Sequence, residues 1–433
     1  MPIRFDNVYV TSTGSFLPGV AVGNDDIDRF IAPINATSAR IKRRILAENG
    51  IATRHYAIDA NGAAVYSNAQ MAAGAIDACL ADAEVTLQDV TMLCTGSSGG
   101  DLAMPGFANM VQGELHAPPM ITSSHQGVCA AGMAALQHAA SALEISKSGH
   151  ALVAASEMPS RMFKRSRFAP RGYETDFDAH FLRWMLSDGA GACLLSSQPR
   201  AAGLSIMVHC INTRWFWGDR PVCLMMGQPA DRDGKSYLDY ASLAEAETAG
   251  AFLLRQDIRL LPHLFELGIH EYVDLVRQGI FRPEDIDHFL CHYSSQKFAG
   301  VVEDLMQRAG LAIPRERWYS NLAERGNTGA ASIFIMLADF IRKRELAPGQ
   351  RILCFVPESG RFSVSFMLLE VVEADAGART FTIAPPHDPS SASSTGARQL
   401  IKELASVWHE YRSRAWRTRL IRKIATGQFT GAD

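Results

Sequence analysis

Two long stretches of the chain share one order of hydrophobic and polar positions. In each, a continuous apolar run precedes a segment with apolar residues every three or four positions. A helix start rich in small residues and a second apolar run follow. Continuous runs are typical of buried strands, and the wider spacing is typical of helices. The pattern therefore predicts strand, helix, helix and strand twice over.

The two stretches also agree in their spacing. From the start of the first apolar run to the small-residue helix there are 40 residues in one stretch, ending at Cys129, and 42 in the other, ending at Asn327. From these helix starts to the end of the second run, at Glu157 and Glu358, there are 28 and 31. This register indicates an internal duplication and predicts an α/β fold with largely parallel, buried strands.

The pattern divides the chain into five expected parts. Residues 1–200 form the first half and residues 266–383 the second, with an insertion or connecting region at 201–265. Residues 384–397 are rich in proline and serine and predict a flexible linker. Residues 398–433 begin with an amphipathic pattern and an excess of lysine and arginine, which predicts a basic helix.

Composition excludes several classes of protein. The 433 residues carry a net charge of −3, which argues against nucleic acid as the main partner. No apolar run is long enough to predict a membrane span. The eight cysteines are scattered without a C-x-x-C pair, so they suggest neither a metal site nor a disulfide framework. We expect a cytoplasmic protein without a metal.

Three polar residues stand where ligand sites collect in such sheets, after strands and at helix starts. Cys129 opens the first small-residue helix, His292 follows the strand "DHFLC", and Asn327 opens the equivalent helix of the second half. A helix N-terminus stabilises a thiolate and can lower the pKa of a cysteine placed there, such as Cys129. Singly these residues would be a buried thiol, a structural histidine and a helix cap; together they indicate nucleophilic catalysis.

A competing motif lies at residues 96–100. The sequence "GSSGG" fits the nucleophile elbow of hydrolases and follows a strand, which makes Ser98 a candidate nucleophile. An elbow feeds directly into a helix, whereas here "DLAMP" intervenes, so we favour Cys129.

Several segments carry a family resemblance. They are "TGSFLP", "NGIATRHYA", "SDGAGACLL", the block around Cys129, the histidine after a strand, and "GNTGAAS". Through them, most of residues 5–372 resembles the thiolase superfamily, specifically the ketoacyl-acyl-carrier-protein synthase III branch. The resemblance implies a thiolase fold, with duplicated α/β halves packed as a five-layer αβαβα sandwich, and a homodimer.

The resemblance also implies roles for residues. Cys129 is the acyl-accepting nucleophile, while His292 and Asn327 hold the thioester carbonyl of the second substrate and stabilise its enolate. The substrates are thioesters of acyl carrier protein or coenzyme A, and no metal or redox cofactor is needed. The family's glycine-triplet loop reads "VPESGRFS" here and keeps only Gly360 as a backbone N–H donor or turn residue.

A subgroup resemblance refines the expected reaction. The stretch "SARIKRRILAENG" with "SNAQ" and "FLRWMLSDGAGA" is similar to ketosynthases of dialkylresorcinol and cyclohexanedione pathways. Those enzymes join a 3-ketoacyl thioester to a 2-unsaturated acyl thioester and close a ring. Because two carbon–carbon bonds need an extra acid or base, Glu157 is a further catalytic candidate. Four cations predict a site for a carrier or coenzyme A: Arg40, Lys42, Arg43 and Arg44.

Three alternatives stay open. The protein could be an initiating 3-oxoacyl synthase that condenses an acyl-CoA with a malonyl carrier thioester. It could be an acyltransferase that passes the acyl group from Cys129 to a hydroxyl or amine. It could also be a scaffolding subunit of a heterodimer, although the intact set of cysteine, histidine and asparagine argues against this.

Overall fold

The computed structural model describes residues 2–172, 177–218, 220–229 and 235–374. The expected linker at 384–397 and the expected basic helix at 398–433 lie outside these residues. No helix in the described ranges has the length and apolar character needed to span a bilayer.

Five strands of the first half form one side of the main sheet, in the order β6–β5–β7–β8–β2. Their bounds are β2 (Tyr9–Phe16), β5 (Val90–Ser97), β6 (Ile121–Gln126), β7 (His150–Glu157) and β8 (Gly189–Ser196). β5 runs parallel to β6 and β7, whereas β8 is antiparallel to both β7 and β2.

Five strands of the second half repeat this arrangement in the order β13–β12–β14–β15–β9. Their bounds are β9 (Leu204–Trp215), β12 (His288–Cys291), β13 (Trp318–Tyr319), β14 (Arg351–Glu358) and β15 (Ser363–Glu373). β12 is parallel to β13 and β14, and β15 is antiparallel to β14 and β9. The predicted duplication is therefore confirmed strand by strand.

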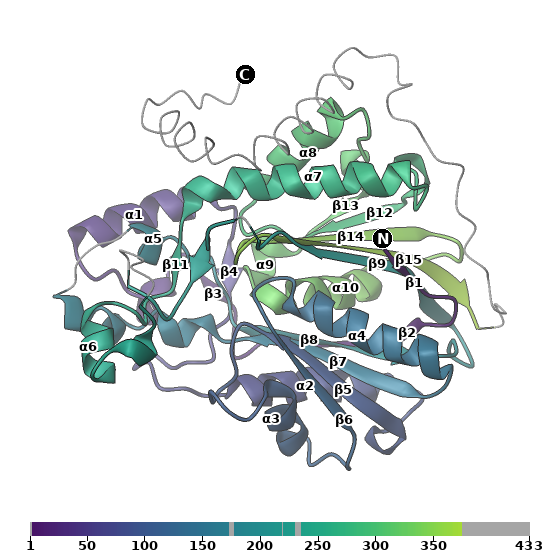
Figure 1. Cartoon of the computed structure of the whole chain (residues 1–433), viewed down its shortest axis with the longest axis horizontal. Helices are drawn as coiled ribbons and strands as arrows, with labels where there is room; N and C mark the ends of the chain where they lie inside the picture. The colour runs from purple at the N-terminus through teal and green to yellow at the C-terminus, as the bar shows by residue number, and fades with distance from the viewer. Residues whose placement is uncertain (1, 173–176, 219, 230–234, 375–433) are drawn as a thin grey trace.

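The two halves fold over so that helices and sheets alternate in five layers (Figure 1). The central layer holds α4 (Ala131–Ser146) and α10 (Ser332–Lys343). One outer layer holds α7 (Leu261–Arg277) and α8 (Lys297–Arg308), and the other holds α2 (Asn68–Ala81) and α3 (Phe107–Glu114). A short pairing of β2 with β9 joins the halves. The expected αβαβα sandwich is confirmed.

The expected connecting region at 201–265 is wrong in its first part. β9 pairs with β15 over its whole length, so it belongs to the sheet of the second half, as β2 belongs to the first. Its apolar run "LSIMVHCINTRW" carries the signal of a buried strand. The second half therefore begins near residue 204.

Shorter elements surround the ends of the sandwich. The helices are α1 (Ala36–Glu48), α5 (Phe177–His180), α6 (Leu243–Thr248) and α9 (Leu322–Arg325). The strands are β1 (Ile3–Arg4), β3 (Val22–Gly23), β4 (Thr53–Arg54), β10 (Leu224–Met225) and β11 (Arg255–Gln256). β10 and β11 form an antiparallel ribbon that flanks the candidate site.

Small residues let the two central helices approach each other at their N-termini. A Cβ at Gly132 would lie 2.6 Å from the Phe334 ring and 2.8 Å from the Ala330 carbonyl oxygen. A Cβ at Gly96 would lie 2.4 Å from the Gly132 nitrogen, so β5 also packs directly on the α4 backbone. This packing brings the residues just before both helices to one place.

Replacing Gly132 by alanine should destabilise the protein by about 1–3 kcal/mol, because the added methyl group overpacks the helix contact. Denaturant unfolding measures this change. Gly113 on α3 is the matched control, since a Cβ there meets nothing within 4 Å. Gly113→Ala should be neutral or stabilising by up to about 1 kcal/mol. Equal stabilities for the two variants would contradict the close packing.

Candidate active site

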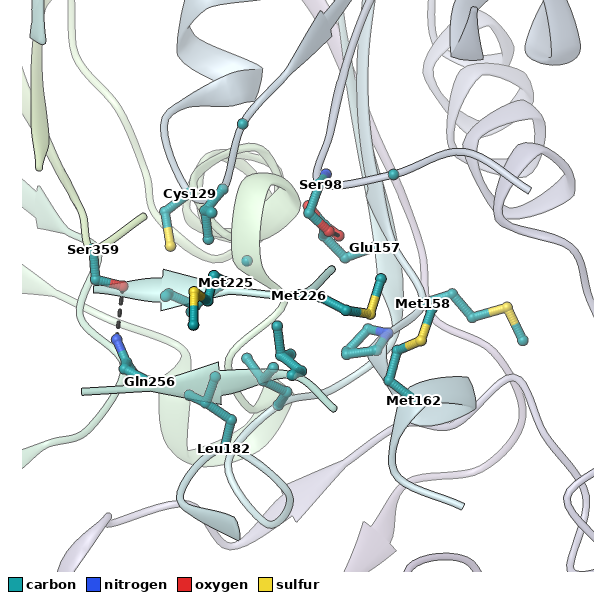
Figure 2. Close-up of a pocket in the computed structure, with 18 of the residues that line it drawn as sticks. Ser98, Cys129, Glu157, Met158, Met162, Leu182, Met225, Met226, Gln256 and Ser359 are labelled. Atoms are coloured by element: carbon teal, nitrogen blue, oxygen red, sulfur yellow. Dashed lines mark hydrogen bonds between the residues drawn. The ribbon is translucent and has the colours of Figure 1, made fainter. Parts of the chain in front are cut away.

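Cys129 lies in the turn between β6 and α4, one residue before the helix cap at Ala130. Its side chain lines a cavity (Figure 2), yet the residue is only 9 % exposed. The cavity wall and the helix start thus place the thiol where a bound acyl group can reach it.

A carboxylate occupies the start of this helix. Glu358, the last residue of β14, accepts hydrogen bonds from the backbone N–H groups of Val128 at 3.2 Å and Ala130 at 2.9 Å. Burial, followed by the charges of Glu358 and Glu157, raises the pKa of Cys129 well above its usual range. The helix N-terminus therefore does not lower this pKa: burial opposes the thiolate first, and the helix start also faces the Glu358 carboxylate.

Asn327 occupies the equivalent place before the second central helix and lines the same cavity. Its backbone N–H donates to the Met185 carbonyl at 3.1 Å, and its Oδ1 accepts from the Gly329 N–H at 3.0 Å. Gly329 has a φ of +54°, which favours glycine, and a Cβ there would lie 3.0 Å from Glu157 Cγ. The motif "GNTG" therefore fixes the amide and leaves room for Glu157.

His292 directly follows β12, and its backbone N–H donates to the Phe355 carbonyl on β14 at 2.9 Å. Burial lowers the pKa of His292 to about 4. The imidazole is therefore neutral near pH 7, so one ring nitrogen can donate a hydrogen bond while the other accepts a proton. Ser294, two residues further, lines the cavity.

Glu157 ends β7 and lines the cavity with Cys129 and Asn327. Its carboxylate accepts from the Ser98 N–H at 2.8 Å and from the Ser98 hydroxyl. Burial raises the pKa of Glu157 to about 7, against the opposing effects of these bonds, the Ala330 N–H and the Arg161 charge. The group is thus poised to exchange a proton near neutral pH.

Ser98 is a partner of this glutamate and not an elbow nucleophile. It follows the end of β5, and the next helix, α3, begins only at Phe107. An elbow requires a direct passage from strand to helix.

The cavity has a volume of about 630 Å³ and is mostly apolar. Figure 2 shows flexible thioethers around it, with Leu182 beside them; they belong to Met158, Met162, Met225 and Met226. Unbranched methionine side chains adapt to differently shaped apolar ligands. This wall suits an acyl chain.

The sequence predicts that Gly360 is either a backbone N–H donor or a turn residue, and the residue lies in the turn after β14. Gly360 directs its carbonyl to the N–H groups of Cys223 at 2.9 Å and Leu224 at 3.2 Å, which holds the start of β10. Ser359 lines the cavity, and its hydroxyl accepts from Gln256 Nε2 at 2.7 Å. The use of Gly360 as an oxyanion donor stays a prediction.

The four expected carrier-binding cations lie on α1. They are Arg40, Lys42, Arg43 and Arg44. Lys42 pairs with Asp28 at 2.6 Å, and Arg44 pairs with Glu48 at 3.3 Å, so part of the charge is neutralised within the chain. The other two side chains are exposed.

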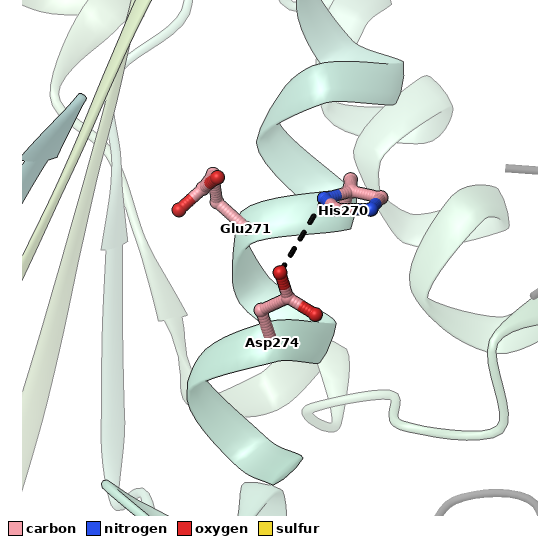
Figure 3. Close-up of side chains that lie close together, drawn as sticks. All are labelled: His270, Glu271 and Asp274. Carbon is pink, nitrogen blue, oxygen red and sulfur yellow. Dashed lines mark ion pairs between the residues drawn. The ribbon is translucent and has the colours of Figure 1, made fainter. Parts of the chain in front are cut away.

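One group of metal-ligand residue types occurs in the described ranges, on α7 and away from the cavity (Figure 3). It comprises His270, Glu271 and Asp274, with 3.7 Å between the histidine Nδ1 and the aspartate Oδ2. The Glu271 carboxylate already binds Arg214 at 3.0 Å and Asn212 at 3.3 Å. This group therefore serves the packing of α7 on β9.

Sequence reasoning missed several site residues. The bond of Ser98 to Glu157 joins two strand ends that are 59 residues apart, and no local pattern signals it. The methionines come from two segments far apart in the sequence, 158–162 and 225–226. The sequence did contain a signal for Glu358 as a site residue, because the repeat places it at the position equivalent to Glu157.

Comparison with known proteins agrees with this geometry. Residues 277–367 match the family model described as "3-Oxoacyl-[acyl-carrier-protein (ACP)] synthase III C terminal". An acetoacetyl CoA synthase from Streptomyces sp. (strain CL190) is 28% identical over 365 residues, covering 83% of this chain and 98% of the relative. A beta-ketoacyl-[acyl-carrier-protein] synthase III from Dinoroseobacter shibae is 24% identical, and the match covers 79% of this chain and 93% of the relative. These homologues are condensing enzymes of the ketosynthase III type.

Solved structures share the fold. A tetronic acid condensing enzyme superposes with a TM-score of 0.66 at 22% identity, covering 84% of this chain and 99% of that one. Cerulenin-bound OleA from Xanthomonas campestris superposes with a TM-score of 0.67 at 19% identity, and the match covers 85% of this chain and 98% of that one. The architecture is therefore a thiolase fold of the ketosynthase III kind.

Proposed function

We propose that this protein is a ketosynthase that joins a 3-ketoacyl thioester to a 2-enoyl thioester and closes a cyclohexanedione ring, a dialkylresorcinol precursor. One observation carries the proposal: Cys129 and Asn327 share an apolar cavity with Glu157, a carboxyl group that can exchange protons. A nucleophile alone forms one acyl bond, whereas ring closure needs further proton transfers.

In the first step, the Cys129 sulfur attacks the carbonyl carbon of the enoyl thioester. The new C–S bond forms, the bond to the carrier sulfur breaks, and the thiol proton passes to the leaving thiolate. We assign this transfer to the neutral His292. The covalent intermediate divides a difficult condensation into two easier steps.

In the second step, the 3-ketoacyl thioester supplies two carbon nucleophiles. Its C2 loses a proton and adds to C3 of the bound enoyl group, whose C2 gains a proton. Its C4 then loses a proton and attacks the Cys129 thioester, which releases the thiol and closes the ring. The product keeps one carrier thioester, which hydrolysis and loss of carbon dioxide remove. The sequence of steps involves no net oxidation or reduction, and side chains carry the protons, so the proposed reaction needs no metal or redox cofactor.

Glu157 suits the proton transfers of this second step. Its carboxylate can accept the proton of an acidic carbon and return it to the enoyl C2. Asn327 and His292 stabilise the enolate oxygen by hydrogen bonds.

We further propose that the substrates arrive on an acyl carrier protein or on coenzyme A. The exposed cations Arg40 and Arg43 on α1 favour an acidic carrier or phosphate groups. The eight cysteines are buried and form no disulfide with one another, which suits a reducing cytoplasm.

We also propose a homodimer. β6 is the last strand in the sheet order, and Ile121 at its start is 60 % exposed. An uncovered sheet edge favours pairing with another strand, and a second copy of β6 would cover it.

A second candidate reaction is the initiating condensation of an acyl thioester with a malonyl carrier thioester. The similarity to a beta-ketoacyl-[acyl-carrier-protein] synthase III favours it. It predicts release of labelled carbon dioxide from malonyl thioester without any 3-ketoacyl substrate.

Mixing the protein with a 3-ketoacyl thioester and a 2-enoyl thioester should yield a cyclic dione, measured by mass spectrometry. Cys129→Ala should yield none, because no acyl-enzyme forms. Cys79→Ala on the outer helix α2 is the control and should retain the product. A condensed product from Cys129→Ala, or only malonyl-dependent product from the wild type, would contradict the proposal.

Replacing Glu157 by glutamine should lower the rate of dione formation by about 10²-fold or more while Cys129 still becomes acylated. Since burial raises the pKa of Glu157 to about 7, the wild-type rate should fall below pH 7 as the base becomes protonated. The variant should lose this limb of the pH–rate profile. A variant with the wild-type rate and profile would remove Glu157 from the mechanism.

A further inference from the structure

Glu358 holds the backbone on both sides of the nucleophile. Its Oε2 accepts from the N–H groups of Val128 and Ala130, at 3.2 Å and 2.9 Å, and Cys129 lies between them. The residue comes from the end of β14, in the other half of the molecule. The turn that carries the thiol is therefore fixed by a single carboxylate from a distant part of the chain.

A neighbouring glycine makes room for this carboxylate. A Cβ at position 360 would lie 3.1 Å from Glu358 Oε1 and 3.0 Å from Val128 Cγ2, both tighter than ordinary contacts. Gly360 thus allows the glutamate to reach across to the Cys129 turn. This requirement explains a glycine at 360 without any contact to substrate.

The internal duplication gives Glu358 a counterpart. Glu157 ends β7 as Glu358 ends β14. Glu157 lies against Gly329, and the Ala330 N–H favours its charged form, so it faces the start of the second central helix. Each half therefore supplies a buried carboxylate to the helix start of the other half.

The two glutamates nevertheless differ in what they face. Glu157 lines the acyl cavity, whereas Glu358 lines a second cavity of about 330 Å³, and both cavities touch Gln126 and Gly127 in the segment before Cys129. His125, Trp215 and Trp217 also line this second cavity. Glu358 is thus placed to act on the thiol through the backbone and through its charge.

We propose that Glu358 is a positioning residue for Cys129: by binding both flanking N–H groups it fixes the direction of the sulfur and sets its reactivity. The inference rests on the nucleophile role proposed above. The inference adds that the Glu358 carboxylate opposes the positive end of the α4 helix dipole, which would otherwise activate the Cys129 thiol. Burial and the nearby Glu358 and Glu157 charges raise the pKa of Cys129, in keeping with this geometry.

Alkylation of Cys129 by iodoacetamide across a range of pH tests the charge effect without any substrate. The groups that can titrate around the thiol are Glu358, Glu157 and His292, with His125 in the second cavity. Glu358→Gln keeps an acceptor oxygen and removes the charge, so the profile should move to lower pH. A shift of about one pH unit raises the thiolate fraction about tenfold and the alkylation rate about threefold.

Glu358→Asp separates position from charge. It keeps the anion but is one methylene shorter, so it cannot hold both N–H groups. Its alkylation profile should stay near the wild type, while acylation of Cys129 by an acyl thioester should slow by about tenfold or more. Glu144→Gln is the matched control, because that glutamate also binds two backbone N–H groups, of Asp6 at 2.9 Å and Asn7 at 3.0 Å.

Thermal unfolding verifies that each variant is folded. A folded Glu358→Gln protein whose alkylation profile coincides with the wild type would overturn the charge effect. If Cys129 of Glu358→Asp is acylated at the wild-type rate, the positioning role is overturned. The aspartate variant also keeps the proposal testable if Glu358→Gln does not fold. Alkylation of Cys129 does not depend on the condensation reaction. The alkylation profiles therefore test the role of Glu358 even if the ring-forming reaction fails.

Discussion

The structure depends on the contact between the N-termini of its two central helices. α4 and α10 meet there because glycine and alanine occupy the crossing, where a single added Cβ at Gly132 would enter the space of Phe334. The contact places Cys129 and Asn327, which precede these helices, at one cavity. β7 then brings Glu157 to this cavity, and β14 brings Glu358 to the backbone of the Cys129 turn. A duplicated fold thus builds one asymmetric site.

The electrostatics of this site differ from those of an isolated helix N-terminus. A helix start would stabilise a thiolate, but burial and then the charges of Glu358 and Glu157 raise the pKa of Cys129, so the proposed nucleophile rests as a thiol. His292 is neutral for the same reason, namely burial without an anionic partner to raise its pKa. In the proposed mechanism the neutral His292 carries the thiol proton, and Glu157 stays available for the carbon acids.

Much of the fold follows from the sequence because duplication makes the hydrophobic pattern appear twice. The run "DVTMLCTGSS" became β5 and "RILCFVPESG" became β14, in equivalent places. β9 was missed because its partners, β15 and β2, lie far along the chain, and a lone apolar strand has no local context. The positions of Cys129 and Asn327 were predictable from helix starts. The raised pKa of Cys129 was not, because it depends first on burial in the folded chain and then on a carboxylate 229 residues away in the sequence.

The central claim is that Cys129 alone carries the acyl group. Incubation of the protein with a 2-enoyl thioester, followed by digestion and peptide mass spectrometry, tests it most directly. The account predicts one acyl group on the peptide that contains Cys129 and none on the same peptide of Cys129→Ala. Acylation of Ser98, or of another cysteine while Cys129 stays free, would contradict it.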